Sequence, residues 1–287
     1  MKNYKEKLSI AALILVAVVI LLWANVGRFH PGKRLETLKA VVLKIGKADA
    51  IVLQCGGDTV VIDAGEEEDG EEVVAYLKEQ GVTRVDTLMI THFDKDHVGG
   101  ADTVVEELEV GQVLLPDYEG NSVEYADFMR TLQESGITPL RVRESLELSL
   151  GDAKLMVDPP ASFEIPEGIL EYDNNLSLVT TVVHGGNRLV LAGDIEKTGI
   201  RQWLESGNAA PCDFIKMPHH GVYTKALEEL LEATKPRYAV ICTSSKNPAE
   251  RKTLELLKTY NVQTMETKDG DVTVLSDGRM LQVQQRW

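Results

Sequence analysis

The sequence predicts an α/β protein in which two mixed sheets pack face to face with helices outside them, a four-layer αββα sandwich, preceded by one N-terminal transmembrane helix. Three observations predict this arrangement. A run of seventeen uncharged residues lies near the N-terminus. Beyond it, apolar runs of strand length alternate with helical patterns in both halves of the chain. The remaining part, about 260 residues, is long enough for one large domain or two small ones.

The uncharged run extends from Leu8 to Ala24 and is preceded by three lysines. Its length is near the lower limit for spanning a bilayer and exceeds most signal-peptide cores, and no convincing cleavage site stands after it. We therefore predict a cytoplasmic tip and signal-anchor over residues 1–26, a linker over residues 27–35 and one folded domain over residues 36–287. A lone N-terminal anchor usually directs the rest of the chain across the membrane, so we expect a single-pass protein of the cell membrane with its domain outside the cytoplasm. Secretion after cleavage is the alternative.

The charge of the chain argues against a general nucleic-acid-binding surface. The formal net charge is −15, and the part beyond residue 26 has 27 basic and 44 acidic side chains. A protein that holds long nucleic acid through phosphate contacts is expected to be basic. The three cysteines form no CxxC pair and no disulfide framework, so we interpret them as small buried hydrophobic residues.

Strands and helices of the first half are predicted from their periodicity and from the glycines that end them. The predicted strands cover residues 35–45, 50–57, 57–65, 84–91 and 112–116, the predicted helices cover residues 71–81, 101–111 and 125–136, and a hairpin covers residues 146–160. The strand over residues 84–91 is continuously apolar toward its end, which is typical of a buried strand.

In the second half of the chain, predicted strands and helices alternate in the same way. The predicted strands cover residues 176–183, 188–194, 213–218 and 238–244, the predicted helices cover residues 196–207, 224–236 and 249–260, and a hairpin covers residues 272–285. His184 falls in the turn between the first two of these strands, so we expect it to be a surface turn residue.

A short segment after the buried strand 84–91 concentrates ligand chemistry. His92, Asp94, Asp96 and His97 lie close together in the sequence HFDKDH. Imidazole and carboxylate groups are the usual protein ligands of Zn²⁺ and Mn²⁺. The glycines at 99 and 100 are expected to let the backbone turn sharply into the next helix.

Two further segments place similar groups after apolar strands. Asp194 follows one strand in LAGDIE, and His219 and His220 follow another in KMPHHG. Ligands at the carboxyl ends of neighbouring strands can meet at one edge of a sheet. Two divalent cations in one site repel each other unless an anion lies between them, so a carboxylate such as Asp194 is needed as a bridge. We predict a site for two divalent metal ions, Zn²⁺ or Mn²⁺.

These motifs together resemble the metallo-β-lactamase superfamily, whose motif is HxHxDH, and most closely the hydrolase domain of the ComEC-type competence (DNA-uptake) proteins. The resemblance extends over residues 36–287 with its motifs in order, which is far more specific than one short pattern. The matching segments are IGKADAIVL, Asp63-Ala64-Gly65, His92 to Gly100, Asn174 to Val179, Gly193-Asp194-Ile195 and His219-His220-Gly221. The resemblance implies a metallo-β-lactamase-like sandwich and metal-dependent hydrolysis.

Two departures from the superfamily pattern bear on the metal. Asp94 stands where the general motif has a histidine, and no histidine lies near residues 174–178, where many members have another ligand. One half of the site is therefore rich in oxygen, which favours Mn²⁺ or a weakly held second Zn²⁺.

The resemblance also implies roles for single residues. The ligands divide into two sets and a bridge: His92 and Asp94, then Asp96, His97 and His220, with Asp194 between them. A hydroxide between the metals would be the nucleophile, and Asp96 would orient it or accept its proton. We expect His219 to face the substrate phosphate, with Asn175 as a second contact, and Asp63 to orient a ligand.

The function that we expect is therefore membrane-anchored, metal-dependent hydrolysis of a phosphodiester, with nuclease activity on single-stranded DNA as the activity that the competence resemblance implies. A smaller phosphodiester is an alternative substrate because the surface is acidic. Because fold does not decide activity, the same motifs are also consistent with a lactone, lactam or thioester hydrolase of the superfamily and with a binding module whose metal site has decayed.

Overall fold

The computed structural model describes residues 35–164 and 172–286. The described residues from Glu36 onward belong to one compact unit. Among the residues described, no helix is long and apolar enough to cross a membrane. The predicted signal-anchor lies outside the described residues, so it stays a prediction.

The first sheet has eight strands in the order β15-β14-β1-β2-β3-β4-β5-β6. From β15 through β14, β1 and β2 to β3 each neighbouring pair is antiparallel, whereas β3 to β6 run parallel to one another. The bounds of these strands are β1 Leu38–Val42, β2 Ile51–Cys55, β3 Asp58–Ile62, β4 Arg84–Met89, β5 Glu109–Pro116, β6 Leu140–Val142, β14 Asp271–Ser276 and β15 Leu281–Arg286.

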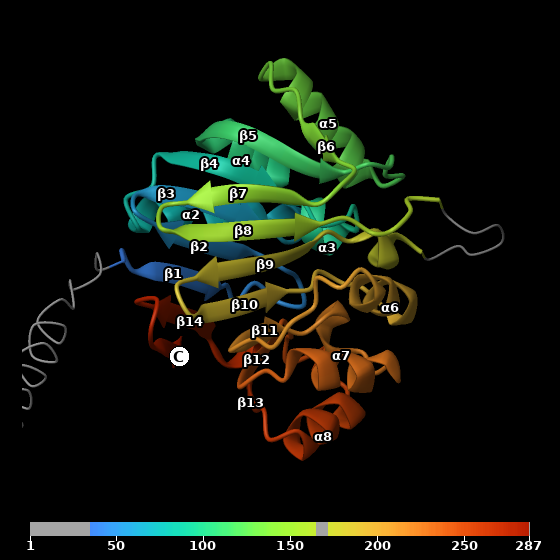
Figure 1. Cartoon of the computed structure of the whole chain (residues 1–287). Coiled ribbons are helices and arrows are strands. Elements are labelled where there is room, and N and C mark those ends of the chain that lie inside the picture. The colour runs from blue at the N-terminus through green and yellow to red at the C-terminus, as the bar shows by residue number, and fades with distance from the viewer. Residues whose placement is uncertain (1–34, 165–171, 287) are drawn as a thin grey trace, which may run out of the picture. The chain divides into compact units, whose positions relative to one another are not determined.

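The second sheet has seven strands in the order β13-β12-β11-β10-β9-β8-β7. Strands β7 to β10 form an antiparallel meander, and β10 to β13 run parallel. The bounds are β7 Leu146–Leu150, β8 Ala153–Asp158, β9 Val179–His184, β10 Asn187–Leu191, β11 Phe214–Lys216, β12 Tyr238–Ile241 and β13 Gln263–Glu266. Figure 1 shows this sheet in front of the first one.

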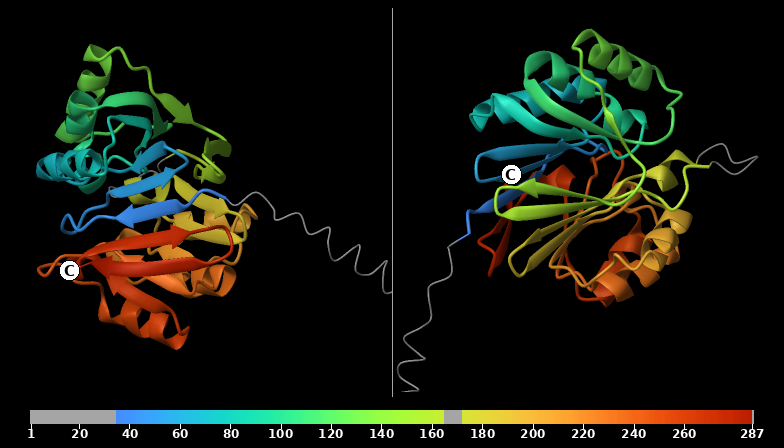
Figure 2. Two further views of the ribbon diagram at one scale, coloured as in Figure 1. Left: turned by 90° about the vertical axis from the view of Figure 1, so that its left-hand side faces the viewer. Right: turned by 45° about the horizontal axis from the view of Figure 1, so that its top comes forward.

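Helices cover the outer face of each sheet. The α-helices are α2 Gly70–Glu79, α3 Lys95–Val98, α4 Ala101–Glu107, α5 Val123–Glu134, α6 Lys197–Glu205, α7 Ala226–Thr234 and α8 Arg251–Thr259, and the 3-10 helices are η1 Glu67–Asp69, η2 Asp173–Leu176, η3 His219–Gly221 and η4 Thr267–Asp269. In the right-hand view of Figure 2 the cyan and green helices lie on one side of the sheets and the orange helices lie on the other.

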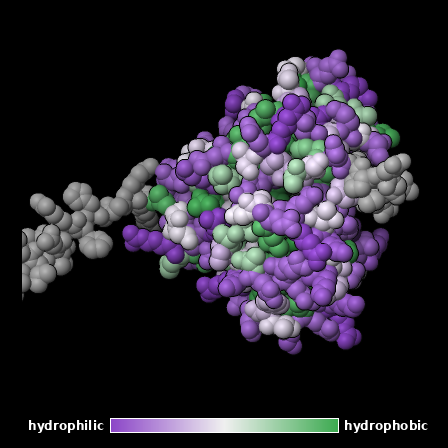
Figure 3. All heavy atoms as spheres, turned by 45° about the vertical axis from the view of Figure 1, so that its right-hand side comes forward, coloured by the Kyte–Doolittle hydropathy of each residue, from purple (hydrophilic) through white to green (hydrophobic). Residues whose placement is uncertain are grey.

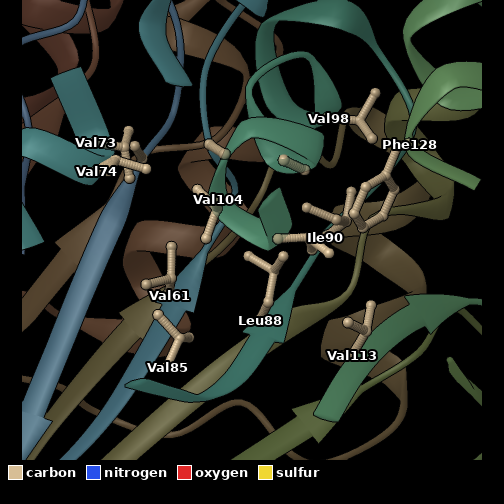
Figure 4. Packing of buried hydrophobic residues seen from close by; sticks show 14 of the residues in the cluster. Val61, Val73, Val74, Val85, Leu88, Ile90, Val98, Val104, Val113 and Phe128 are labelled. Carbon is tan, nitrogen blue, oxygen red and sulfur yellow. The ribbon is translucent and has the colours of Figure 1, made fainter. Parts of the chain in front are cut away.

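Three hydrophobic layers hold the sandwich together. The middle layer joins the facing sides of the two sheets, through residues such as Leu53 and Leu155. One outer layer packs the first sheet against α2, α4 and α5, where Leu88 and Val85 meet Val104 (Figure 4). The other packs the second sheet against α6, α7 and α8. Because each fully buried aliphatic side chain contributes roughly 1.5–3 kcal/mol, these layers are the main source of stability. The predicted four-layer sandwich is confirmed.

The structure corrects three local predictions. Strand β5 begins at Glu109, inside the stretch predicted as helix, and the short edge strands β6 and β13 were not predicted. His184 is not a surface residue: its side chain is fully buried, and its Nδ1 lies 2.8 Å from Oγ of Ser276 on β14. The prediction of buried cysteines is confirmed, since Cys55, Cys212 and Cys242 are all buried and free.

The face of the molecule shown in Figure 3 is mostly hydrophilic, with hydrophobic residues scattered among polar ones. Isolated exposed hydrophobic residues of this kind are normal for a globular surface.

Candidate metal centre

The predicted ligands lie at one edge of the sandwich, where strands of both sheets end. Asp63 directly follows β3, and His92 follows β4 in the first sheet. Asp194 follows β10, and His220 follows β11 in the second sheet. The expected convergence of strand ends is therefore present, and each sheet contributes part of the site.

His97, His220 and Asp194 form the centre of the cluster. The Nε2 atoms of His97 and His220 lie 3.3 and 3.0 Å from Oδ2 of Asp194. Oδ2 of Asp96 lies 3.3 Å from Nε2 of His220. His97, His220 and Asp194 are all buried, whereas Asp96 is partly exposed.

His92 and Asp94 lie beside this centre. The imidazole ring of His92 is 4.0 Å from that of His97, measured between centroids. Nε2 of His92 lies 3.6 Å from Oδ2 of Asp94, whose side chain is 44% exposed. The pair is thus open to solvent on the Asp94 side, as the more accessible half of a two-metal site would be.

Asp63 holds His97 in place. Its Oδ2 lies 2.8 Å from Nδ1 of His97, and its two oxygens accept hydrogen bonds from N and Oγ1 of Thr91. The carboxylate therefore fixes the ring orientation and leaves Nε2 of His97 pointing into the cluster, which is the arrangement typical of an orienting residue.

Two charged residues that we did not predict belong to the same cluster. Asp49 precedes β2, and Lys216 is the last residue of β11. Both side chains are buried, and the Lys216 ammonium contacts Asp49, Oδ1 of Asp194 at 2.9 Å and the carbonyl oxygen of Gly193 at 2.9 Å.

The two adjacent histidines after β11 have different surroundings. His220 enters the cluster, and its Nδ1 lies 3.1 Å from the carbonyl oxygen of Cys242. His219 stays at the rim, where its Nδ1 is 3.0 Å from Oε1 of Glu196 and its Nε2 is 3.4 Å from Nδ2 of Asn174. Burial lowers the pKa of His219 and outweighs the opposite effect of nearby carboxylates.

A left-handed backbone turn separates these two imidazoles. His219, His220 and Gly221 have φ values of 46°, 49° and 75°. A residue other than glycine in this region costs roughly 1–2 kcal/mol. The turn is closed by a hydrogen bond of 2.8 Å from N of Val222 to O of His219. It holds the two rings 6.3 Å apart, with their planes at 66°, so only one of them joins the cluster.

Asn175 lies beside the start of α6. It is buried, and its Oδ1 accepts a hydrogen bond of 2.7 Å from N of Gly199 in α6. Its neighbour Asn174 is the residue that contacts His219. The amide of Asn175 therefore stabilises the start of a helix, and a supporting role or a substrate contact for this residue stays a prediction.

The paired glycines after the first ligands act differently from our expectation. Gly99 and Gly100 form the turn between α3 and α4 with φ values of −54° and −84°, which other residues also adopt, so the turn itself does not require glycine. A Cβ on Gly100 would lie 2.4 Å from the carbonyl oxygen of Ala64. These glycines instead let the loop after β3 approach the ligand segment closely.

The cluster attracts positive charge. Burial lowers the pKa of His97, but the carboxylates around it, above all Asp194, outweigh burial and raise that pKa well above its usual value. The same balance raises the pKa of His220 to about 9. Burial raises the pKa of Asp194, but His220 and Lys216 outweigh it and hold the pKa well below its usual value. A site that draws protons onto both imidazoles is suited to a cation.

The donor atoms fit a metal ion. The Nε2 atoms of His92, His97 and His220 are buried and make no hydrogen bond to any part of the chain that the structure describes. Asp49, His97, Asp194 and His220 can each offer one ligand atom, all within 4.8 Å of one another. Buried polar atoms are normally paired, so three unpaired imidazole nitrogens beside carboxylates indicate a divalent cation site.

Two cavities flank the cluster. One, of about 520 Å³, is lined by Asp96 together with Lys44, Lys47 and Lys95, and by several acidic side chains. The other, of about 170 Å³, lies beside His219 and Glu196. The rim residues of the site are therefore accessible to a ligand from two sides.

The family of the chain is indicated by its similarity to known proteins. The model of the metallo-beta-lactamase superfamily matches residues 44–245. Curated relatives include ComE operon protein 3 of Bacillus subtilis, with 27% identity over 69% of this chain and 25% of the relative. Recombination protein 2 of Haemophilus influenzae has 24% identity over 82% of this chain and 27% of the relative. Competence protein ComA of Neisseria gonorrhoeae has 24% identity over 79% and 30%, respectively.

One relative is named as a competence protein and another as a recombination protein, and the chain spans 25–30% of the length of these three relatives. Solved structures share the fold at low identity. A mutant of CmlA beta-hydroxylase has a TM-score of 0.54 and 15% identity, over 88% of this chain and 54% of that one. The metallo-beta-lactamase fold protein YhfI from Bacillus subtilis has a TM-score of 0.51 and 9% identity, over 79% and 95%. Since the family model matches well over half of the sequence, and the fold and the cluster of histidines and aspartates agree with it, this chain belongs to the metallo-beta-lactamase superfamily, whose members are in general metal-dependent hydrolases.

Proposed function

We propose that the chain is a metal-dependent phosphodiesterase, and that its substrate is single-stranded DNA. The observation that carries this proposal is the convergence of unpaired Nε2 atoms from His97 and His220 on Oδ2 of Asp194, with His92 and Asp94 alongside. A pair of divalent cations bound there would supply Lewis acidity toward a phosphoryl oxygen and would acidify a bound water.

The residues divide as the motif implies. His92 and Asp94 would hold one ion, His97, His220 and Asp96 would hold the other, and Asp194 would lie between them. The accessible pair contributes a single nitrogen ligand, which favours Mn²⁺ or a weakly bound Zn²⁺ in that position. Asp63 keeps His97 in the orientation that the site requires.

Two rim residues are placed to act on the substrate. Asp96 is partly exposed beside the larger cavity and would accept a proton from the attacking water. His219 is held through Nδ1 by Glu196 and would contact the phosphate or the leaving oxygen through Nε2. Burial lowers the pKa of His219, which favours its neutral imidazole and a contact through hydrogen bonding.

The choice of substrate rests on two supports. One relative is named as a competence protein and another as a recombination protein, which favours DNA. The larger cavity next to Asp96 is lined by Lys44, Lys47 and Lys95, which would meet a phosphate near the metals, while the five carboxylates of the same lining favour a short contact over a long nucleic-acid track. We further propose that residues 1–26 anchor the protein in the cell membrane with the hydrolase domain outside the cytoplasm.

The experiment measures metal content and turnover on one preparation. The full chain is stripped with a chelator, reloaded with Mn²⁺ or Zn²⁺, and assayed on bis(p-nitrophenyl) phosphate and on labelled single-stranded DNA. We expect about two metals per chain and turnover that vanishes on chelation. Asp194→Asn should lower turnover by at least roughly 100-fold with loss of metal. His219→Ala should lower turnover while the metal content is unchanged.

A matched control is Asp158→Asn, which removes a buried carboxylate that accepts hydrogen bonds from Ser145, Trp203 and Asn208. It should leave metal content and turnover close to those of the unmodified protein. Hydrolysis of a lactone, a β-lactam or a thioester without any phosphodiester cleavage would contradict the proposal. A folded protein that binds no divalent cation would instead indicate a binding module.

A further inference from the structure

Lys216 is a fully buried cation directly beneath the candidate metal centre. Its ammonium group contacts three acceptors: Oδ1 of Asp194 and the carbonyl oxygen of Gly193, each at 2.9 Å, and the carboxylate of Asp49. The contacts with Gly193 and Asp194 are hydrogen bonds, and the contact with Asp49 is an ion pair. A positive charge next to the position of two dications needs a physical explanation, because it repels them.

Asp49 lies behind the two imidazoles and not in front of them. Its Oδ1 is 3.8 Å from Nδ1 of His220, and its Oδ2 is 3.9 Å from Nδ1 of His97. Those Nδ1 atoms already have partners, the Cys242 carbonyl and the Asp63 carboxylate. The unpaired Nε2 atoms face Asp194 instead. Asp49 is therefore close to the ligands but on the wrong side of both rings to bind the same cation.

Asp194 has its two oxygens in different surroundings. Oδ1 accepts a hydrogen bond from Lys216, while Oδ2 is the atom that both histidine Nε2 atoms approach. The ammonium occupies one lone pair of Oδ1 and disfavours a second cation there, so Oδ2 is the oxygen better placed to bind a metal.

We propose that Lys216 and Asp49 are a built-in pair of positioning residues: Lys216 holds Asp194 so that it binds metal through Oδ2 alone, and Asp49 is the counter-ion that neutralises Lys216 and is not itself a ligand. This inference rests on the proposed metal centre. It predicts that the two members of the pair have opposite effects on the local charge. Removing Asp49 alone leaves a buried ammonium uncompensated beside the metals, whereas removing both members leaves the local charge unchanged.

The test compares Asp49→Asn with the double variant Asp49→Asn/Lys216→Met. The full chain is freed of metal, and the affinity for Mn²⁺ and Zn²⁺ is measured by competition with a chromophoric chelator. We expect Asp49→Asn to bind both metals at least roughly tenfold more weakly. The double variant should recover to within about threefold of the unmodified protein, because a buried ion pair can often be replaced by neutral groups without loss of folding.

A second readout reports on Asp194 directly. With Co²⁺ as a probe, the visible absorption spectrum of the double variant should differ from that of the unmodified protein, because Oδ1 of Asp194 is then free to bind metal. The control Asp158→Asn, at a buried carboxylate with no contact to these residues in the described structure, should leave affinity and spectrum unchanged.

The inference is overturned if Asp49→Asn binds metal as tightly as the unmodified protein or more tightly, if the double variant is as weak as the single one, or if its Co²⁺ spectrum is unaltered. These results leave the proposed metal centre intact. If the unmodified protein itself binds no divalent cation, the proposed function fails first, so the two failures are distinguishable.

Discussion

Replacing Asp63 with Asn tests whether a carboxylate behind the cluster controls metal binding. Asp63 has a left-handed backbone, with φ of 59°. Asn is among the few residues that tolerate this conformation, so Asp63→Asn keeps both the shape of the side chain and the turn after β3. The Asn oxygen can still accept the hydrogen bond that N of Thr91 donates to Oδ1 at 2.7 Å.

The contacts of Oδ2, with Nδ1 of His97 and with Oγ1 of Thr91, are the ones that change, and the contact with His97 bears on the metal. In the unmodified protein a carboxylate oxygen lies 2.8 Å from Nδ1 of His97, which places the ring proton on Nδ1 and leaves Nε2 free. An amide nitrogen in that position is a donor, so Nδ1 must become the acceptor and the proton moves to Nε2, the atom that faces Asp194. Metal binding must then displace this proton. We expect metal affinity to fall by roughly 10–100-fold, which is about 1.4–2.7 kcal/mol.

The assay is chelator competition with Mn²⁺ and Zn²⁺ at constant pH, with a folding check by circular dichroism. Asp86→Asn is the control, because Asp86 is a carboxylate of the adjacent strand β4 that accepts a hydrogen bond from N of Thr59 and pairs with Arg84, outside the cluster. Metal affinity of Asp63→Asn within twofold of the unmodified protein would refute the orienting role of Asp63.

Two further predictions concern stability. Gly221→Ala should lower the free energy of unfolding by about 2–4 kcal/mol, because the residue has a φ of 75° and its new Cβ would lie 2.9 Å from Ile241 and 3.1 Å from Ala249. Gly81→Ala is the control, since Gly81 has a φ of 76° but no neighbour within 4 Å, so the difference between the two variants in denaturant unfolding measures the steric contribution. Equal losses of stability in the two variants would contradict this contribution. Burial raises the pKa of Asp69 from 3.8 to about 6, so the unfolded chain loses this proton first and stability should fall as pH rises from 4 to 6. Asp69→Asn should remove this fall in stability. Because the carboxyl group is half-exposed, the variant should be more stable than the unmodified protein by only about 1 kcal/mol at pH 7 and equally stable below pH 4. A stability difference that does not depend on pH would contradict this reasoning.

Most strands and helices could be predicted because their hydrophobic period is strong. The strands β4 and β11 each end in a run of buried residues, so the ligand segments after them were located correctly. The strand β13 was missed because its four residues are partly or fully exposed and carry no alternation. The correct placement of the fold thus results from periodicity, and the errors lie at the edges of the sheets, where burial is incomplete.

The errors around the site have a different cause. Lys216 stands at the end of an apolar strand and would ordinarily be interpreted as a surface residue, whereas its two carboxylate partners come from other segments. His184 was assigned to the surface because its turn looked exposed, but the hairpin β14–β15 covers it through Ser276. Pairings between distant segments of this kind leave no local pattern. The one available signal was a charged residue inside a continuous apolar strand, at Lys216.

The pairing of β1 with β14 has a consequence for the order in which the molecule can be made. Leu38 pairs with Ser276, so the neighbour that completes one side of β1 is synthesised only after almost the whole domain. Until then the growing polypeptide leaves that backbone edge unsatisfied and open to wrong partners. We expect productive folding to wait for the final hairpin, and a chaperone or rapid release from the ribosome to raise the yield of native protein.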